Sequence, residues 1–179
     1  MKFCSECGSQ VEYLIPQGDN LKRYVCTHCE TIHYQNPRII AGCIPTYEDK
    51  VLLCKRAIQP QYGFWTLPAG FMENDETTEQ AAERETWEEA LAKVQDLSLY
   101  GLYSIPHINQ VYLMYRGHLA IPEFSPGTES LETRLFSENE IPWDELAFPV
   151  VHKTLKHYFA EHKQNSFSLH TGAIYRKKK

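Results

Sequence analysis

Four charged side chains within one short stretch have the spacing of a metal-binding helix face. Residues 70–92 contain Arg84, Glu85, Glu88 and Glu89. On a helix, Glu85, Glu88 and Glu89 are three or four positions apart and crowd onto one face. Like charges at this spacing destabilise a helix unless a cation neutralises them, and Mg²⁺ binds carboxylate oxygens and bridges them to phosphates. Arg84 lies four positions before Glu88, so a charge-assisted hydrogen bond could orient that carboxylate.

The alternative is an ordinary solvated acidic face. Such a face usually alternates positive and negative charges. Here the acids cluster at one end of the stretch, and Arg84 is the only basic residue between positions 70 and 92. The clustering favours a metal site.

The stretch resembles the Nudix box, G-x5-E-x7-R-E-U-x-E-E-x-G-U, in which U is a bulky aliphatic residue. The matching positions are Gly70, Glu76, Arg84, Glu85, Glu88 and Glu89. Thr86 and Ala92 occupy the aliphatic positions, and Leu91 replaces the second glycine. Glycine at that point would suit the left-handed conformation in which many helices end, so Leu91 leaves the helix ending open. The carboxylates are unaffected by these departures.

The order of the expected elements supports an α/β fold. Hydrophobic patterns predict strands and helices in this order: strands at 38–46, 51–56 and 64–71, a helix from Thr77 or Thr78 to about Leu91, strands at 97–105, 111–121 and 134–136, and a helix at 150–162. This order suits an α/β/α sandwich around a mixed sheet. The Nudix fold is of that kind, and the resemblance covers residues 38–163.

Nudix proteins hydrolyse a nucleoside diphosphate linked to another moiety, X. The resemblance implies that Glu85, Glu88 and Glu89 bind catalytic Mg²⁺ or Mn²⁺, with Glu89 holding a bridging ion. It also implies a catalytic role for Arg84 and a substrate-binding role for Gly70. Such cations would neutralise phosphate oxygens and polarise the attacking water.

Three residues outside the box could complete the site. Glu129 and Glu132 precede the last expected strand, and either could be the general base. Glu132 is similar to a third metal ligand of NADH pyrophosphatases, while the alternative is a pair of solvated loop acids. Arg56 could clamp a phosphate, because arginine binds anions in a bidentate manner, or it could be a surface charge. The aromatic residues that could stack a flavin or adenine ring, or fill the core instead, are Tyr34, Phe64, Tyr103 and Tyr112.

The first 34 residues resemble a zinc ribbon. They carry two CxxC pairs, formed by Cys4, Cys7, Cys26 and Cys29. Four cysteines at this spacing are typical of a closed structural zinc site, and so short a segment needs such a staple. Two disulfides are disfavoured in an intracellular chain, and a redox CxxC would need a βαβ context. Residues 11–15 and 21–25 are the expected hairpin strands.

The length and net charge of the chain limit its domain count and the kinds of partner it is expected to bind. A chain of 179 residues suits one medium domain with a small appendage. A net charge of −5 argues against a general nucleic-acid binder, although the chain ends in a basic tail from Arg176 to Lys179, expected to be solvated. No secretory signal or membrane-spanning run is visible, so a soluble cytoplasmic protein that acts on small nucleotides is expected.

The sequence predicts three segments: a zinc ribbon at 1–34, a Nudix hydrolase domain at 35–163 and a tail at 164–179. The tail contains the apolar run FSLHTGAIY, which needs cover from the core or from a second subunit of a homodimer.

The choice of X follows from a wider resemblance to plant-type FAD and ADP-ribose pyrophosphatases. It rests on the stretches YQNP, LLCKR and FWTLPAGF, on EL-AF, and on His170-x-Gly172. NADH pyrophosphatases are more distant, because IPWDELAFPVV stands where they carry SQPWPxPxS. The resemblance implies hydrolysis of FAD to FMN and AMP, or of ADP-ribose to ribose 5-phosphate and AMP. Two alternatives stay open: a sanitiser acting on dNTPs or a capped RNA end, and a non-catalytic sensor of ADP-ribose or a flavin nucleotide.

Overall fold

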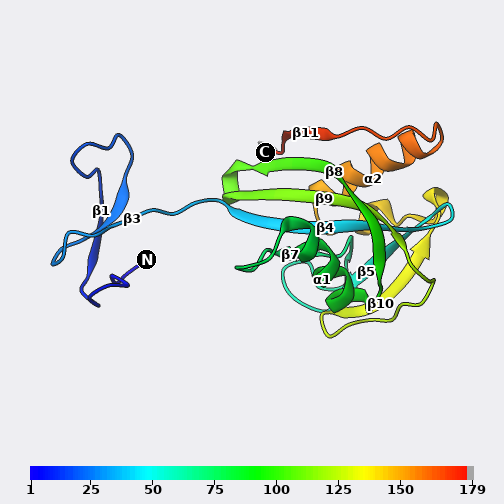
Figure 1. Ribbon diagram of the computed structural model, residues 1–179, viewed down its shortest axis with the longest axis horizontal. Coiled ribbons are helices and arrows are strands. Elements are labelled where there is room, and N and C mark those ends of the chain that lie inside the picture. Colours follow the sequence, from blue (N-terminus) through cyan, green and yellow to red (C-terminus); the bar gives the residue numbers. More distant parts are fainter. Residues whose placement is uncertain (177–179) are drawn as a thin grey trace. The chain divides into compact units, whose positions relative to one another are not determined.

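The computed structural model describes residues 1–176 and divides into two compact units. The smaller unit is Met1–Pro37 and the larger begins at Arg38, close to the expected boundary (Figure 1). The expectation of a solvated basic tail falls mainly on residues 177–179, which lie outside the described residues. No helix in the described chain is long and apolar enough to cross a membrane.

The smaller unit is a three-stranded antiparallel sheet with almost no hydrophobic core. Its strands, in spatial order, are β1 (Val11–Leu14), β2 (Arg23–Cys26) and β3 (Ile32–His33). The predicted hairpin is present as β1 and β2. Among residues 1–37, only Cys4, Pro16 and Cys26 are buried. The cysteine sulfurs therefore take the place that apolar side chains fill in a larger domain.

The larger unit is built on one mixed eight-stranded sheet. Its main path has the order β10-β5-β4-β9-β8-β11, with β6 paired to β5 and β7 paired to β4. The strands are β4 (Arg38–Tyr47), β5 (Lys50–Arg56), β6 (Trp65–Thr66), β7 (Ala69–Phe71), β8 (Val94–Ile105), β9 (Gln110–Leu119), β10 (Ser130–Phe136) and β11 (His170–Ala173). The β4–β9 and β8–β11 pairs are parallel, and the other pairs are antiparallel.

The strand expected at residues 64–71 is in fact two strands. Thr66 pairs with Cys54 of β5, whereas Phe71 pairs with Ile40 of β4. The segment changes partner at Leu67 and Pro68, and proline has no N–H to donate to a ladder. This crossing delivers Gly70 to the helix that follows.

Two helices cover opposite faces of this sheet, as the predicted α/β/α sandwich requires (Figure 1). α1 (Thr78–Ala90) packs Ala81 and Ala82 against Ala41 of β4. α2 (Pro149–His162) packs into the main core, which includes Ile44 of β4. Short 3₁₀ helices lie at Pro106–Ile108, Glu138–Glu140 and Trp143–Glu145.

The tail docks on the core of its own chain. Its strand β11 pairs in parallel with β8, from His170 opposite Gly101 to Ala173 opposite Ser104. Phe167 and Ile174 pack against the main core. Glu161 of α2 accepts hydrogen bonds from Ser168 of the tail at 2.6 Å and from Tyr100 of β8 at 2.7 Å.

Deleting the residues after Gln164 should therefore destabilise the larger unit. The loss of two packed apolar side chains and one strand pairing should cost on the order of 3 kcal/mol, which lowers Tm by roughly 10 °C for a domain of this size. Thermal unfolding measures the change. Leu169→Ala removes an exposed side chain from the same segment and should leave Tm nearly unchanged. An unchanged Tm in the truncated chain would contradict the docking.

Candidate active site and zinc site

The helix that carries the box acids is capped at both ends. Thr77 accepts a hydrogen bond from the Gln80 N–H at 3.1 Å, and the Gln80 side chain accepts one from the Thr77 N–H at 2.8 Å. Leu91 ends the helix in the left-handed conformation, with φ 47° and ψ 31°. A non-glycine residue there costs about 1–2 kcal/mol. The departure from the box glycine thus leaves the helix ending intact but makes it strained.

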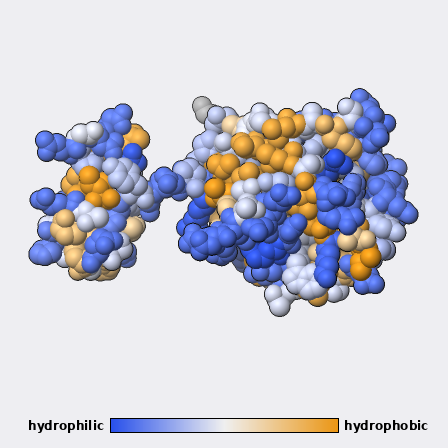
Figure 2. Space-filling model, in the orientation of Figure 1, coloured by the Kyte–Doolittle hydropathy of each residue, from blue (hydrophilic) through white to orange (hydrophobic). Residues whose placement is uncertain are grey.

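The face of α1 that packs on the sheet consists of small residues and two acids. Its buried residues are Ala81, Ala82, Glu85, Thr86, Glu89 and Ala90. Small side chains let the helix lie close to β4 and β7, and this carries Glu85 and Glu89 inside the protein. Glu88 remains 55% exposed. Figure 2 shows hydrophilic residues gathered over α1, beside an apolar area over β8 and β9.

Arg84 links the box acids to one another. Its Nη1 donates to Glu85 at 2.7 Å and to Glu88 at 3.1 Å, as the spacing predicts for Glu88. Its Nε and Nη2 donate to Glu76 at 3.0 and 2.7 Å. The hydrogen bond from Arg84 lowers the pKa of Glu76 to about 2. Arg84 thus positions three carboxylates with one guanidinium.

Gly70 lies where no larger residue fits. It pairs with Ala41 across the β7–β4 ladder, and a Cβ at this position would overlap the Glu85 carboxylate. The close approach of strand and helix therefore depends on the missing side chain. Gly70 also borders the cavity described next.

One cavity of about 660 Å³ is lined by both the box acids and apolar side chains. The charged part of its lining is formed by Arg56, Arg84, Glu85, Glu88, Glu89 and Glu129. The apolar part includes Ile105, Ile108, Tyr112, Phe148 and Ile174. This volume is typical of small-molecule sites, and such a mixed lining suits a ligand with an anionic part and a ring.

The charged part of the lining favours a bound cation. Burial raises the pKa of Glu89 to about 8, with a further upward contribution from Glu85 and Glu129. Burial also raises the pKa of Glu85, although Arg84 opposes the shift. Buried carboxylates that resist ionisation become favourable ligands once a divalent ion supplies positive charge, and oxygen donors suit Mg²⁺ or Mn²⁺. The donor set therefore fits a hard divalent ion.

Arg56 belongs to the wall of this cavity and is not a surface charge. Only 9% of the residue is exposed. Its Nε donates to the Pro60 carbonyl at 2.8 Å, and its guanidinium lies 5.1 Å from the Phe148 ring centroid. Its positive charge also opposes the upward pKa shift of Glu89. Arg56 is thus positioned beside the acids in the wall of the cavity.

The two acids outside the box are separated by the structure. Glu129 borders the cavity. Glu132 was expected in a loop but lies within β10, exposed and opposite Lys55. The difference arises because β10 begins at Ser130, four residues before the expected strand at 134–136, so Glu132 pairs within the ladder while Glu129 stays in the preceding loop. Glu132 borders neither this cavity nor the one described below, and its expected role as base or metal ligand stays a prediction.

Sequence reasoning found part of the apolar lining. Of the three proposed stacking residues in the larger unit, Phe64, Tyr103 and Tyr112, only Tyr112 borders the cavity, whereas Tyr103 is fully buried in the core. Tyr34 lies in the smaller unit. Phe148 and Ile174 were not singled out. Phe148 lies in the EL-AF stretch, which the resemblance to plant-type pyrophosphatases had already marked. Ile174 lies in the apolar tail, which was expected to pack against the core or a second subunit.

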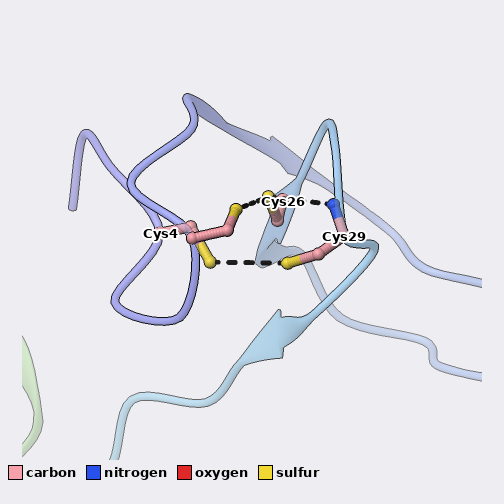
Figure 3. Close-up of side chains that lie close together, drawn as sticks. Cys4, Cys26 and Cys29 are labelled. Carbon is pink, nitrogen blue, oxygen red and sulfur yellow. Dashed lines mark hydrogen bonds between the residues drawn. The ribbon is translucent and has the colours of Figure 1, made fainter.

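The four cysteines of the smaller unit converge on one centre. Their sulfurs all lie within 4.8 Å of one another, and none forms a disulfide. The Cys4 and Cys29 sulfurs are 3.7 Å apart (Figure 3). The Cys7 and Cys26 sulfurs are 3.4 Å apart. A tetrahedral zinc ion with Zn–S bonds of about 2.3 Å requires sulfur separations of roughly 3.8 Å, so the set fits structural zinc.

Among the described residues, no other set of three or more metal-ligating side chains converges this closely. The box glutamates would therefore have to move to bind one ion together.

Family comparisons agree with both sites. A model described as Nudix N-terminal, a zinc ribbon, matches residues 2–35, and the NUDIX domain model matches residues 36–159. The chain belongs to the Nudix family. It is a Nudix hydrolase with an N-terminal zinc ribbon, as its box and cysteine pairs indicate.

Several relatives are informative. A crystal structure of a NUDIX hydrolase from Nitrosomonas europaea is 57% identical with a TM-score of 0.95, and the match covers 98% of this chain and 100% of that one. The NAD-capped RNA hydrolase NudC of Haemophilus influenzae (strain PittGG) is 29% identical over 90% of this chain and 63% of its own length. An ADP-ribose pyrophosphatase of Methanocaldococcus jannaschii is 33% identical over 64% of this chain and 69% of its own length.

The chain spans less than two thirds of the length of the NudC relatives that it matches. Because their name includes a capped RNA, the charge argument does not exclude a nucleic-acid partner for this hydrolase.

Proposed function

We propose that this Nudix hydrolase cleaves the diphosphate of an adenosine diphosphate linked to X, with ADP-ribose, NADH and FAD as candidate substrates. The main support is the cavity of about 660 Å³, which is lined by the box carboxylates, by Arg56 and by apolar side chains. The names of the relatives, an ADP-ribose pyrophosphatase and an NAD-capped RNA hydrolase, share an adenosine diphosphate unit. FAD rests on the sequence resemblance to plant-type enzymes.

Each part of the cavity would have its own task. The apolar part, with Tyr112 and Phe148, would hold a nucleoside. Arg56 would bind a phosphate oxygen, and Arg84 would keep Glu85 and Glu88 in place. Mg²⁺ or Mn²⁺, when bound by the box glutamates, would supply charge neutralisation at the phosphates and a more acidic water.

The reaction needs a base close to the diphosphate. Glu129 belongs to the charged part of the lining and would take the proton of the attacking water. The water oxygen forms a bond to one phosphorus while the bridging P–O bond breaks, and the bridging oxygen leaves on the other phosphate. The products are AMP and the phosphate of X, which is ribose 5-phosphate for ADP-ribose and FMN for FAD.

Turnover on a panel tests this function. Purified protein with Mg²⁺ or Mn²⁺ would be incubated with FAD, ADP-ribose, NADH, a dNTP and an oxidised dNTP, and the products separated by chromatography. AMP with FMN, ribose 5-phosphate or reduced nicotinamide mononucleotide is the expected result. Hydrolysis of the dNTPs alone would indicate a nucleotide-pool sanitiser. Tight binding of one compound without any turnover would indicate a sensor.

A further inference from the structure

A second cavity adjoins the box acids. It has a volume of about 530 Å³ and shares Glu85, Glu88, Glu89 and Glu129 with the main cavity, but no other residue. Its remaining lining is formed by Trp87, Leu91, Pro126, Gly127 and Thr128. The four carboxylates therefore lie at the junction of two separate cavities.

One wall of this second cavity is held firmly. The Gly127 N–H donates to the Glu89 carbonyl at 3.0 Å, and the Ser125 N–H donates to the Ala90 carbonyl at 2.9 Å. These bonds satisfy carbonyls that the end of α1 leaves free. A Cβ at Gly127 would overlap the Glu88 carbonyl oxygen, so the loop lies directly on the helix.

α1 forms another wall of this cavity, and Trp87 and Leu91 add two apolar side chains to it beside the glutamates. Trp87 is 47% exposed and Leu91 is 40% exposed. The two residues are four positions apart, so they lie on one helix face. Lys93 places its Nζ 5.8 Å from the centroid of the Trp87 ring. An exposed indole beside carboxylates offers a flat apolar surface on which a planar ring can stack.

Leu91 gives an independent reason to regard this wall as functional. It occupies the box position of glycine and adopts a left-handed conformation that glycine would adopt without strain. Its side chain borders the second cavity. The strained backbone at Leu91 thus places an apolar side chain in a cavity beside the acids. Backbone strain of this kind clusters at ligand-binding and active sites.

We infer that the second cavity receives a planar aromatic ring carried by X, with Trp87 as its stacking platform. The inference rests on the proposed function. A diphosphate bound at the junction carries one substituent on each phosphorus, and the two cavities provide one space for each. The adenosine would occupy the main cavity, and a nicotinamide or isoalloxazine ring would lie on Trp87. Ribose 5-phosphate has no such ring, so ADP-ribose would not use the platform.

Substrate comparison in Trp87→Ala tests the inference. Stacking of a base on an aromatic side chain contributes about 1–3 kcal/mol, so kcat/KM for NADH and FAD should fall roughly tenfold or more. The value for ADP-ribose should stay within about twofold of wild type, because its X has no ring to stack. Trp87→Phe retains a ring and should recover most of the loss. Ile121→Ala, which removes an exposed apolar side chain outside both cavities, should change neither value.

Other outcomes would overturn the inference. An equal loss on ADP-ribose and FAD would show that Trp87 only supports the helix. No loss on any substrate would show that X lies elsewhere. Leu91→Gly provides a variant that relieves backbone strain, so it should keep the fold while weakening FAD and NADH more than ADP-ribose. A wild-type protein that hydrolyses none of the three refutes the proposed function itself, before any variant is compared.

Discussion

Replacing Glu89 with glutamine should lower kcat by about 1000-fold on every substrate that the wild type hydrolyses. Glu89 is the most deeply buried box carboxylate, and it borders both cavities. Glutamine keeps the shape but removes the negative charge that a divalent ion requires. A catalytic metal contributes several kcal/mol to charge stabilisation in the transition state, and about 4 kcal/mol corresponds to this factor. Steady-state kinetics with Mg²⁺ measures the loss.

The same substitution should stabilise the metal-free protein at high pH. Burial raises the pKa of Glu89 from 4.5 to about 8, so the folded state resists an ionisation that the unfolded chain accepts. The free energy of unfolding of the wild type therefore falls as pH rises from about 4.5 to about 8, by roughly 3–5 kcal/mol. Glu89→Gln removes this penalty. Its Tm in EDTA should exceed that of wild type by several degrees at pH 8.5 and should be nearly equal to it at pH 5.

Glu83→Gln is the matched control, because Glu83 is exposed on the same helix and borders neither cavity. It should change neither activity nor the pH dependence of Tm. Added Mg²⁺ should raise the Tm of wild type, as any ligand specific for the folded state does, but not that of Glu89→Gln. A Glu89→Gln protein that keeps activity would show that Glu89 is not a metal ligand. A variant less stable than wild type at pH 8.5 in EDTA would contradict the raised pKa of Glu89.

The box helix was predictable because its determinants are local. The spacing of Glu85 and Glu89 places both on one helix face whatever surrounds them, and Thr77 with Gln80 forms a capping box within four residues. The Arg84–Glu88 hydrogen bond follows from the same periodicity. In a helix the period alone decides which side chains meet.

The acids and rings outside the box could not be placed with the same certainty. Glu129 and Glu132 differ by three positions, and β10 begins between them at Ser130, so Glu129 borders the cavity from a loop while Glu132 pairs within the strand. Tyr103 and Tyr112 are directly paired on neighbouring strands, yet one fills the core and the other borders the cavity. These outcomes depend on long-range packing, which a hydrophobic pattern does not encode.

Replacing Cys26 with serine should unfold residues 1–37 and leave the larger unit folded. The smaller unit buries only Cys4, Pro16 and Cys26, so its sulfur cluster serves as its core. In small zinc modules, metal binding energy is folding energy, on the order of 10 kcal/mol. Elemental analysis should show a zinc content that falls from about one per chain to almost none, as expected for a four-thiolate site that loses a ligand. Hydrogen exchange should show lost protection in β1–β3 alone.

Cys43→Ala separates this effect from the loss of any buried cysteine. Cys43 is buried in β4 of the larger unit and lies outside the sulfur cluster, so its removal should leave the zinc content unchanged. Every residue that borders either cavity follows Pro37. Hydrolysis of ADP-ribose should therefore persist in Cys26→Ser. Survival of zinc binding and of β1–β3 protection in Cys26→Ser would contradict this prediction. The smaller unit would then have to be held together by something other than its four thiolates, although it has few buried apolar residues.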